Sequence, residues 1–148
     1  MFWENINNTS PARRGGKGKR MIEKLNQILQ GLLRNPIIEE TIIESWVVRK
    51  YANGKAEAIF NYSPTLSAVS TEKGSLYVGA NATSTLPAGV FNHIYRVDAK
   101  LAHAGTGVAE IGIRSYDTEK IVWYVWASTA WQSGQQIVAQ FKVEGTWK

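Results

Sequence analysis

The feature that most constrains the fold is an alternation of apolar and polar residues that starts near Thr41 and recurs to Val143. A period of two places the apolar side chains on one face of a β-strand. Segments rich in Gly, Asn, Asp and Ser interrupt the pattern about every ten residues, as hairpin turns do. The sequence therefore predicts a mainly β chain with an antiparallel, jelly-roll-like β-sandwich over residues 36–148, and a barrel is the alternative.

The strongest turn signal is Asn53-Gly54, which lies between predicted strands 41–51 and 55–62. Asn-Gly is typical of type I′ hairpin turns, because both central residues of that turn need positive φ. On a later strand the alternation places Tyr95 and Val97 on the same inner face. Further strands are predicted at 66–71, 75–80, 92–103, 108–116, 121–130 and 136–143, with residues 81–90 as a loop.

The period changes in residues 21–34, which are predicted to form a helix that Pro36 ends. Two heptads are marginal as an isolated helix, so this one needs a partner surface. We expect residues 21–35 to form a short trimeric coiled coil; packing on the chain's own β domain is the alternative. The predicted trimerisation residues have a and d spacing: Ile22, Leu25, Leu29 and Leu32.

Residues 1–20 are predicted to form a basic, extended N-terminal arm. Residues 1–21 hold five Arg or Lys and one Glu, whereas the net charge of the whole chain is +5. An acidic protein surface is the expected partner, and nucleic acid is a less favoured one because aromatic residues do not alternate with the charges. The predicted anchoring residues of the arm are Phe2, Trp3, Arg13, Arg14, Lys17, Lys19 and Arg20.

An aromatic run at residues 121–126 is apolar on both faces of its predicted strand. One face can fill the core, so the other needs a cover, either a neighbouring subunit or a glycan stacked on the rings. Of the two, the subunit interface is favoured. The predicted interface or glycan platform consists of Trp123, Tyr124, Trp126 and Trp131.

No catalytic constellation stands out, and we expect no enzyme activity, cofactor or metal. The chain has no cysteine, and its histidines, His93 and His103, are predicted near opposite ends of one strand, roughly 30 Å apart. A carboxylate pair for glycoside cleavage could be drawn from Asp98, Glu110 and Asp117, but their spacing does not distinguish them from surface charges. Neither a membrane-spanning segment nor a secretory signal is predicted.

Residues 46–58, with Trp46, an Arg-Lys-Tyr step and a Gly-Lys-Ala-Glu hairpin, resemble a known family. Together with the ending Gly145-Thr146-Trp147-Lys148, they are similar to the C-terminal domains of bacteriophage minor structural and receptor-binding proteins. The resemblance covers about residues 42–148. Thr146 stands where the family usually has Arg, and Ile59-Phe60 stands where Trp-Gly is common.

The resemblance implies a trimer on a virion appendage. Such domains follow a coiled coil or fibrous stalk, and two heptads indicate a short head fibre, a capsid decoration protein or a tail or baseplate spike rather than a long tail fibre. The implied partners are two further copies of the chain, capsid or tail proteins, and host-surface glycans, although pure decoration needs no ligand. The alternatives are a stand-alone carbohydrate-binding module and, more remotely, a nucleic-acid-binding protein that uses the basic arm.

Overall fold

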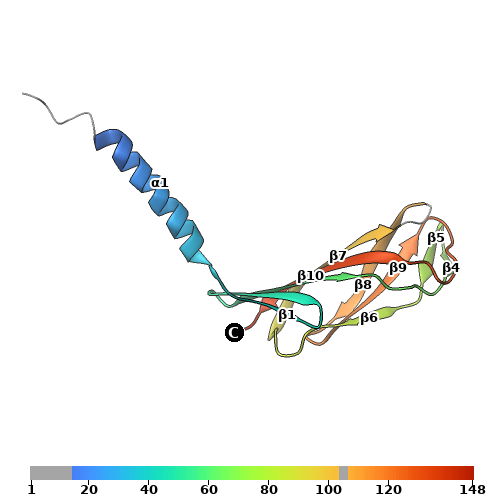
Figure 1. Cartoon of the computed structure of the whole chain (residues 1–148). Helices are drawn as coiled ribbons and strands as arrows, with labels where there is room; N and C mark the ends of the chain where they lie inside the picture. The colour runs from blue at the N-terminus through green and yellow to red at the C-terminus, as the bar shows by residue number, and fades with distance from the viewer. Residues whose placement is uncertain (1–14, 104–106) are drawn as a thin grey trace, which may run out of the picture. The chain divides into compact units, whose positions relative to one another are not determined.

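The computed structural model describes residues 15–103 and 107–148. The chain divides into a helical unit that ends at Pro36 and a β unit that runs from Ile37 to Lys148 (Figure 1). The described residues form one helix and ten strands, and every strand pairing is antiparallel.

The helix, α1, spans Gly15–Arg34 and therefore begins inside the predicted arm. Glycine lowers helix stability by about 1 kcal/mol relative to alanine but does not prevent helix formation, and the Lys and Arg residues between the glycines are good helix formers. The first turn has no acidic residue to interact with the helix dipole, whereas Arg34 lies favourably in the last turn. Pro36 follows the end of α1, as predicted.

Two antiparallel sheets make up the β unit (Figure 1). The first sheet contains, in spatial order, β1 (Ile37–Ile43), β2 (Trp46–Tyr51), β3 (Lys55–Tyr62), β10 (Ile137–Thr146) and β7 (His93–His103). The second contains β4 (Val69–Lys73), β5 (Leu76–Gly79), β9 (Lys120–Ala127), β6 (Ala82–Thr85) and β8 (Ala109–Tyr116). In this second sheet β5, β6 and β8 all pair with β9.

The core lies between the two sheets, which confirms the predicted antiparallel sandwich. On β10 the alternate residues Ile137, Ala139, Phe141 and Val143 are all buried. They meet β9 across the core, where the rings of Trp123 and Phe141 have centroids 5.5 Å apart. Alternate residues of both strands thus fill one layer, as the period-two pattern requires.

The predicted strand 41–51 is wrong, because a turn divides it into β1 and β2. Glu44 and Ser45 form this turn with φ values of 51° and 72°. Both residues adopt the left-handed conformation without being Gly or Asn, so the sequence carried no turn signal. The next hairpin is where Asn53-Gly54 predicted it, but only Gly54 has positive φ, which fits a three-residue loop and not a type I′ turn.

Two further predictions failed because they depended on partners far away in sequence. The predicted loop 81–90 contains β6, a polar strand that pairs with β9. Tyr95 does not point inward but is 49% exposed, because the register between β10 and β7 shifts at Glu144/Gly145. A Cβ atom at Gly145 would overlap the carbonyl oxygen of His93, so this shift requires glycine.

Candidate functional site

A row of large apolar side chains lies exposed along α1. Of the predicted trimerisation residues, Ile22, Leu25 and Leu29 are 51–60% exposed, and the side chain of Leu32 lies outside the described set. Met21 and Ile28 widen the row. Their spacing of three and four residues places them on neighbouring turns of one helix face. A contiguous exposed apolar row is typical of surfaces that contact another protein or another copy.

The predicted anchoring residues can be placed only in part. Phe2, Trp3, Arg13 and Arg14 lie outside the described residues. The remaining three fall within α1, where Lys19 and Arg20 are exposed and the side chain of Lys17 is not described. The anchoring role of the arm stays a prediction.

The four residues of the predicted aromatic platform do not lie on a single surface, because two of them, Trp123 and Trp131, are buried. Trp123 is 1% exposed and donates a hydrogen bond from its indole N–H to Ser84 Oγ at 3.0 Å. Trp131 is also buried, and its backbone exchanges hydrogen bonds with that of Val69. Both are core residues, because inward positions alternate along β9 and the loop after it folds back over the sandwich.

Tyr124 and Trp126 lie on the outer face of β9 and are half-buried. The Tyr124 ring covers Gly112, its register partner on β8, and a Cβ atom at Gly112 would overlap that ring. Trp126 lies between Val78 and Glu110 in the register. A sugar that stacked on this sheet would rest on these two rings.

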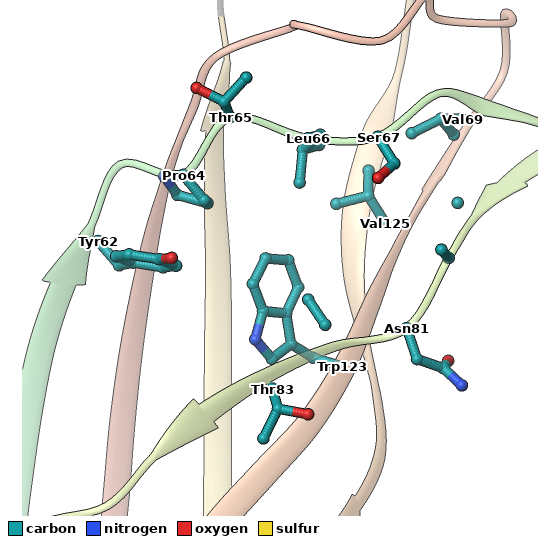
Figure 2. Close-up of a pocket in the computed structure, with 13 residues that line it drawn as sticks. Tyr62, Pro64, Thr65, Leu66, Ser67, Val69, Asn81, Thr83, Trp123 and Val125 are labelled. Carbon is teal, nitrogen blue, oxygen red and sulfur yellow. The ribbon is translucent and has the colours of Figure 1, made fainter.

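A pocket of about 150 Å³ opens between the segment after β3 and the segment that joins β5 to β6 (Figure 2). Trp123 and Val125 of β9 form its back, and Tyr62 and Leu66 form one side. The remaining polar groups of the lining are hydroxyls and one amide, from Thr65, Ser67, Asn81 and Thr83.

The pocket lining has no Asp, Glu, Lys, Arg or His. A cavity of this volume can hold one six-membered ring. Tyr62 at the rim continues an aromatic row, since its ring stacks on Phe60, which stacks on Trp46. The chemistry therefore suits a small neutral ligand with one apolar face, and the lining holds no acid–base pair for catalysis.

The outer face of the first sheet carries a charge network of alternating sign. The strand register places Glu57 opposite both Arg49 and Glu144, so two nearly buried carboxylates are neighbours. Lys142 bridges them, with Nζ 2.7 Å from Glu57 Oε1 and 3.3 Å from Glu144 Oε1. The network consists of Glu40, Arg49, Lys55, Glu57, Arg96, Asp98, Lys142 and Glu144.

The cations hold both carboxylates in the ionised form. Burial alone would raise the pKa of Glu57, but hydrogen bonds from Lys142 and Tyr51 outweigh it, so this pKa lies below its usual value. The hydrogen bond from Lys55 lowers the pKa of Glu144 in the same way. The network is thus internally neutralised and resembles a structural brace more than a binding site.

The residues that carry the family resemblance support the β2–β3 hairpin. Trp46 is buried and donates its indole N–H to the carbonyl oxygen of Thr85 at 3.1 Å. The indole N–H of Trp147 donates to the Tyr51 carbonyl at 3.1 Å, and its backbone N–H donates to the Gly54 carbonyl at 2.9 Å. The ammonium group of Lys148 lies 4.6 Å from the Trp147 ring centroid. These motifs therefore hold the fold together, and their residues do not line the pocket of Figure 2.

The three carboxylates considered for catalysis lie apart in the fold. Asp98 forms an ion pair with Arg96 at 2.7 Å, and Glu110 lies on the other sheet. Asp117 accepts hydrogen bonds from the backbone N–H groups of Glu119 and Lys120, which lower its pKa.

His93 and His103 stand at the two ends of β7, as predicted. Within residues 15–103 and 107–148, no cluster of three or more potential metal ligands occurs.

Comparison of the chain with known protein families, curated proteins and solved structures found no match. Among the described helical residues, no segment is long and apolar enough to cross a bilayer.

Proposed function

We propose that this chain is a homotrimeric surface protein of a bacteriophage virion: a short head fibre, a capsid decoration protein or a tail or baseplate spike. The arm anchors it to a capsid or tail protein, α1 forms the trimer, and the β unit faces outward and contacts host-surface glycans. The observation that carries the proposal is an amphipathic helix with an exposed apolar row, followed at once by a β unit that has its own core.

The trimer is supported by the width of the apolar row on α1. Met21 and Ile28 flank the positions with a and d spacing, and a stripe wider than a and d alone suits three helices better than two. Burying one such side chain contributes about 1.5–3 kcal/mol, so the row can offset the low stability of a single short helix.

The jelly-roll-like character is supported by the path of the chain. After β3 the chain enters the second sheet for β4 to β6, returns for β7, crosses again for β8 and β9, and returns for β10. Repeated crossing of this kind is typical of two interlocked Greek keys, an arrangement common in viral capsid and lectin domains. The fold does not by itself identify the function.

Adhesion to glycans is supported by the uncharged pocket and by the two half-exposed rings on the outer face of β9. Shallow sites of this kind bind weakly one at a time, and several copies on one particle gain avidity. The same pocket also supports the second candidate, a stand-alone carbohydrate-binding module, which needs neither trimer nor arm.

The test is the solution mass of the full chain, measured by light scattering beside a protein that begins at Pro36. We expect the full chain at three times its 16.5 kDa mass and the shorter protein as a monomer. Replacing Leu25 and Leu29 by Asp should also give monomers, whereas Gln27→Asp on the opposite helix face should leave the trimer intact. A monomeric full chain would contradict the proposal and make the binding module the leading candidate.

A further inference from the structure

The starting observation is a second exposed apolar surface, at the edge of the first sheet. Ile37, Ile38 and Ile42 of β1 are 48%, 53% and 72% exposed, and we call these three residues the β1 patch. Within the described chain, β1 pairs only with β2, so its other edge is free. On the outer face of the sheet, Val47 of β2 lies beside Ile42 as its register partner, and Ile59 of β3 lies beside Val47.

The β1 edge combines the three exposed isoleucines with two acidic residues, Glu39 and Glu40. A free strand edge invites pairing with other chains, and proteins commonly shield it with charged side chains. The opposite edge strand, β7, alternates Arg96, Asp98 and Lys100 on its outer face. On β1, Glu40 binds Arg49 at 2.6 Å and Glu39 binds Lys50 at 3.2 Å, so both ion pairs are made to β2 and the three isoleucines stay exposed.

The chain connection specifies which molecule can cover the β1 patch. The helix ends at Arg34 and β1 begins at Ile37, so the two Cα atoms can be at most about 11 Å apart. In a closed trimer a threefold axis makes the three helices point in the same direction, and their ends lie at the same height around the axis. All three copies of β1 must therefore begin beside the end of the helix bundle, whatever the orientation of the β units.

We propose that the β1 patch is a second subunit interface, in which the patches of three copies pack on one another around the axis directly after the helix bundle. This inference rests on the proposed trimer and adds to it: the helices and β1 form one continuous interface. It also explains why an edge strand with three exposed isoleucines can persist, because assembly removes it from water.

The first experiment compares the assembly strength of full-length variants by sedimentation at several protein concentrations. Ile38→Lys combined with Ile42→Lys should raise the concentration at which the trimer dissociates by about tenfold or more. Val138→Lys is the matched control, because Val138 is 47% exposed on the outer face of the same sheet. Circular dichroism confirms that both variants keep the fold.

The second experiment uses the absence of cysteine from the chain. A disulfide requires Cα atoms about 4.4–6.8 Å apart, so it reports directly on proximity. Under oxidation, full-length Ile37→Cys should give a covalent dimer within the trimer, and Val138→Cys should stay monomeric under denaturing conditions. Adding the Leu25→Asp and Leu29→Asp changes to Ile37→Cys should abolish the cross-link.

The outcomes separate the two proposals. A full chain that is monomeric overturns both the trimer and the interface. A trimer whose dissociation is unchanged by the β1 substitutions, and whose Ile37→Cys variant does not cross-link, leaves the proposed trimer standing and overturns the β1 interface alone.

Discussion

At the scale of single residues, the pairing of Glu57 with Glu144 is the least expected feature of the β unit. Two neighbouring, nearly buried carboxylates repel each other unless cations satisfy them, and Lys142 and Lys55 do so here at 2.7–2.8 Å. The sequence could not predict this pairing, because it depends on the register between β3 and β10, which are far apart along the chain. Local alternation indicates only that both residues lie on an outer face.

Replacing Glu57 by Gln should lower the free energy of unfolding at neutral pH by about 1–3 kcal/mol, because it removes the nearly buried carboxylate that binds Lys142. Glu40→Gln is the control: that side chain is 53% exposed, and its loss should cost less than about 1 kcal/mol. Urea unfolding measures both. Equal losses in the two variants would contradict the role assigned to Glu57.

The same substitution should change the pH dependence of stability. The pKa of Glu57 is lower in the folded than in the unfolded state. The ionised side chain therefore stabilises the folded protein fully above pH 4.5, the ordinary glutamate pKa, and this stabilisation is lost as the pH falls through the pKa of the folded state. The unmodified protein should therefore lose stability steeply in this acidic range. Glu57→Gln should show a shallower loss, and an unchanged slope would argue against the ionised network.

At the scale of elements, the strands with clear alternation were predicted well, whereas the turn between β1 and β2 was missed. The positions of β3, β7, β8 and β10 follow from period-two patterning that the buried sheet face enforces. The Glu44-Ser45 turn could not be found in this way, because ordinary residues are held there at positive φ by the pairing of β1 with β2. The start of α1 was missed because its glycines were interpreted as part of an extended arm, whereas glycine weakens a helix without ending it.

Replacing Glu44-Ser45 by Asn-Gly should stabilise the β unit by about 1 kcal/mol, because both residues then adopt positive φ at little cost. Gly54→Ala tests the reverse effect in the neighbouring hairpin, where Gly54 has a φ of 89°. Alanine is strained at positive φ, so this change should destabilise the β unit by about 1 kcal/mol. Thermal and urea unfolding of the two variants measure the effects. A destabilised Asn-Gly variant would show that the Glu44 or Ser45 side chain has a further role.

At the scale of the whole molecule, the chain combines a helix that exposes an apolar row with a β unit that buries a core of its own. The β unit has its own core, whereas α1 exposes the residues that would stabilise it. Of the candidate sites, the apolar row on α1 was predicted from its spacing alone. The pocket was not, because it forms between segments 62–69 and 79–83, which only the packing of the two sheets brings together.

This division predicts two thermal transitions. Loss of α1 helicity should shift to higher temperature as the protein concentration rises, because a trimer is stabilised by mass action. Unfolding of the separated β unit should not depend on concentration. Circular dichroism at several concentrations distinguishes the two, and a single transition that is independent of concentration would show that α1 is not held by other copies.

The position of β10 between β3 and β7 has a consequence for biosynthesis. Sheet formation cannot follow the order of translation, because the strand that joins the two flanking strands is made after both of them. While the ribosome is still adding residues before Ile137, β3 has one unpaired side and β7 has neither side paired. Closure of the sheet is therefore a late and long-range step, which makes folding slow relative to a helical protein of the same length. Chaperone binding during synthesis would protect these two strands until the last one arrives.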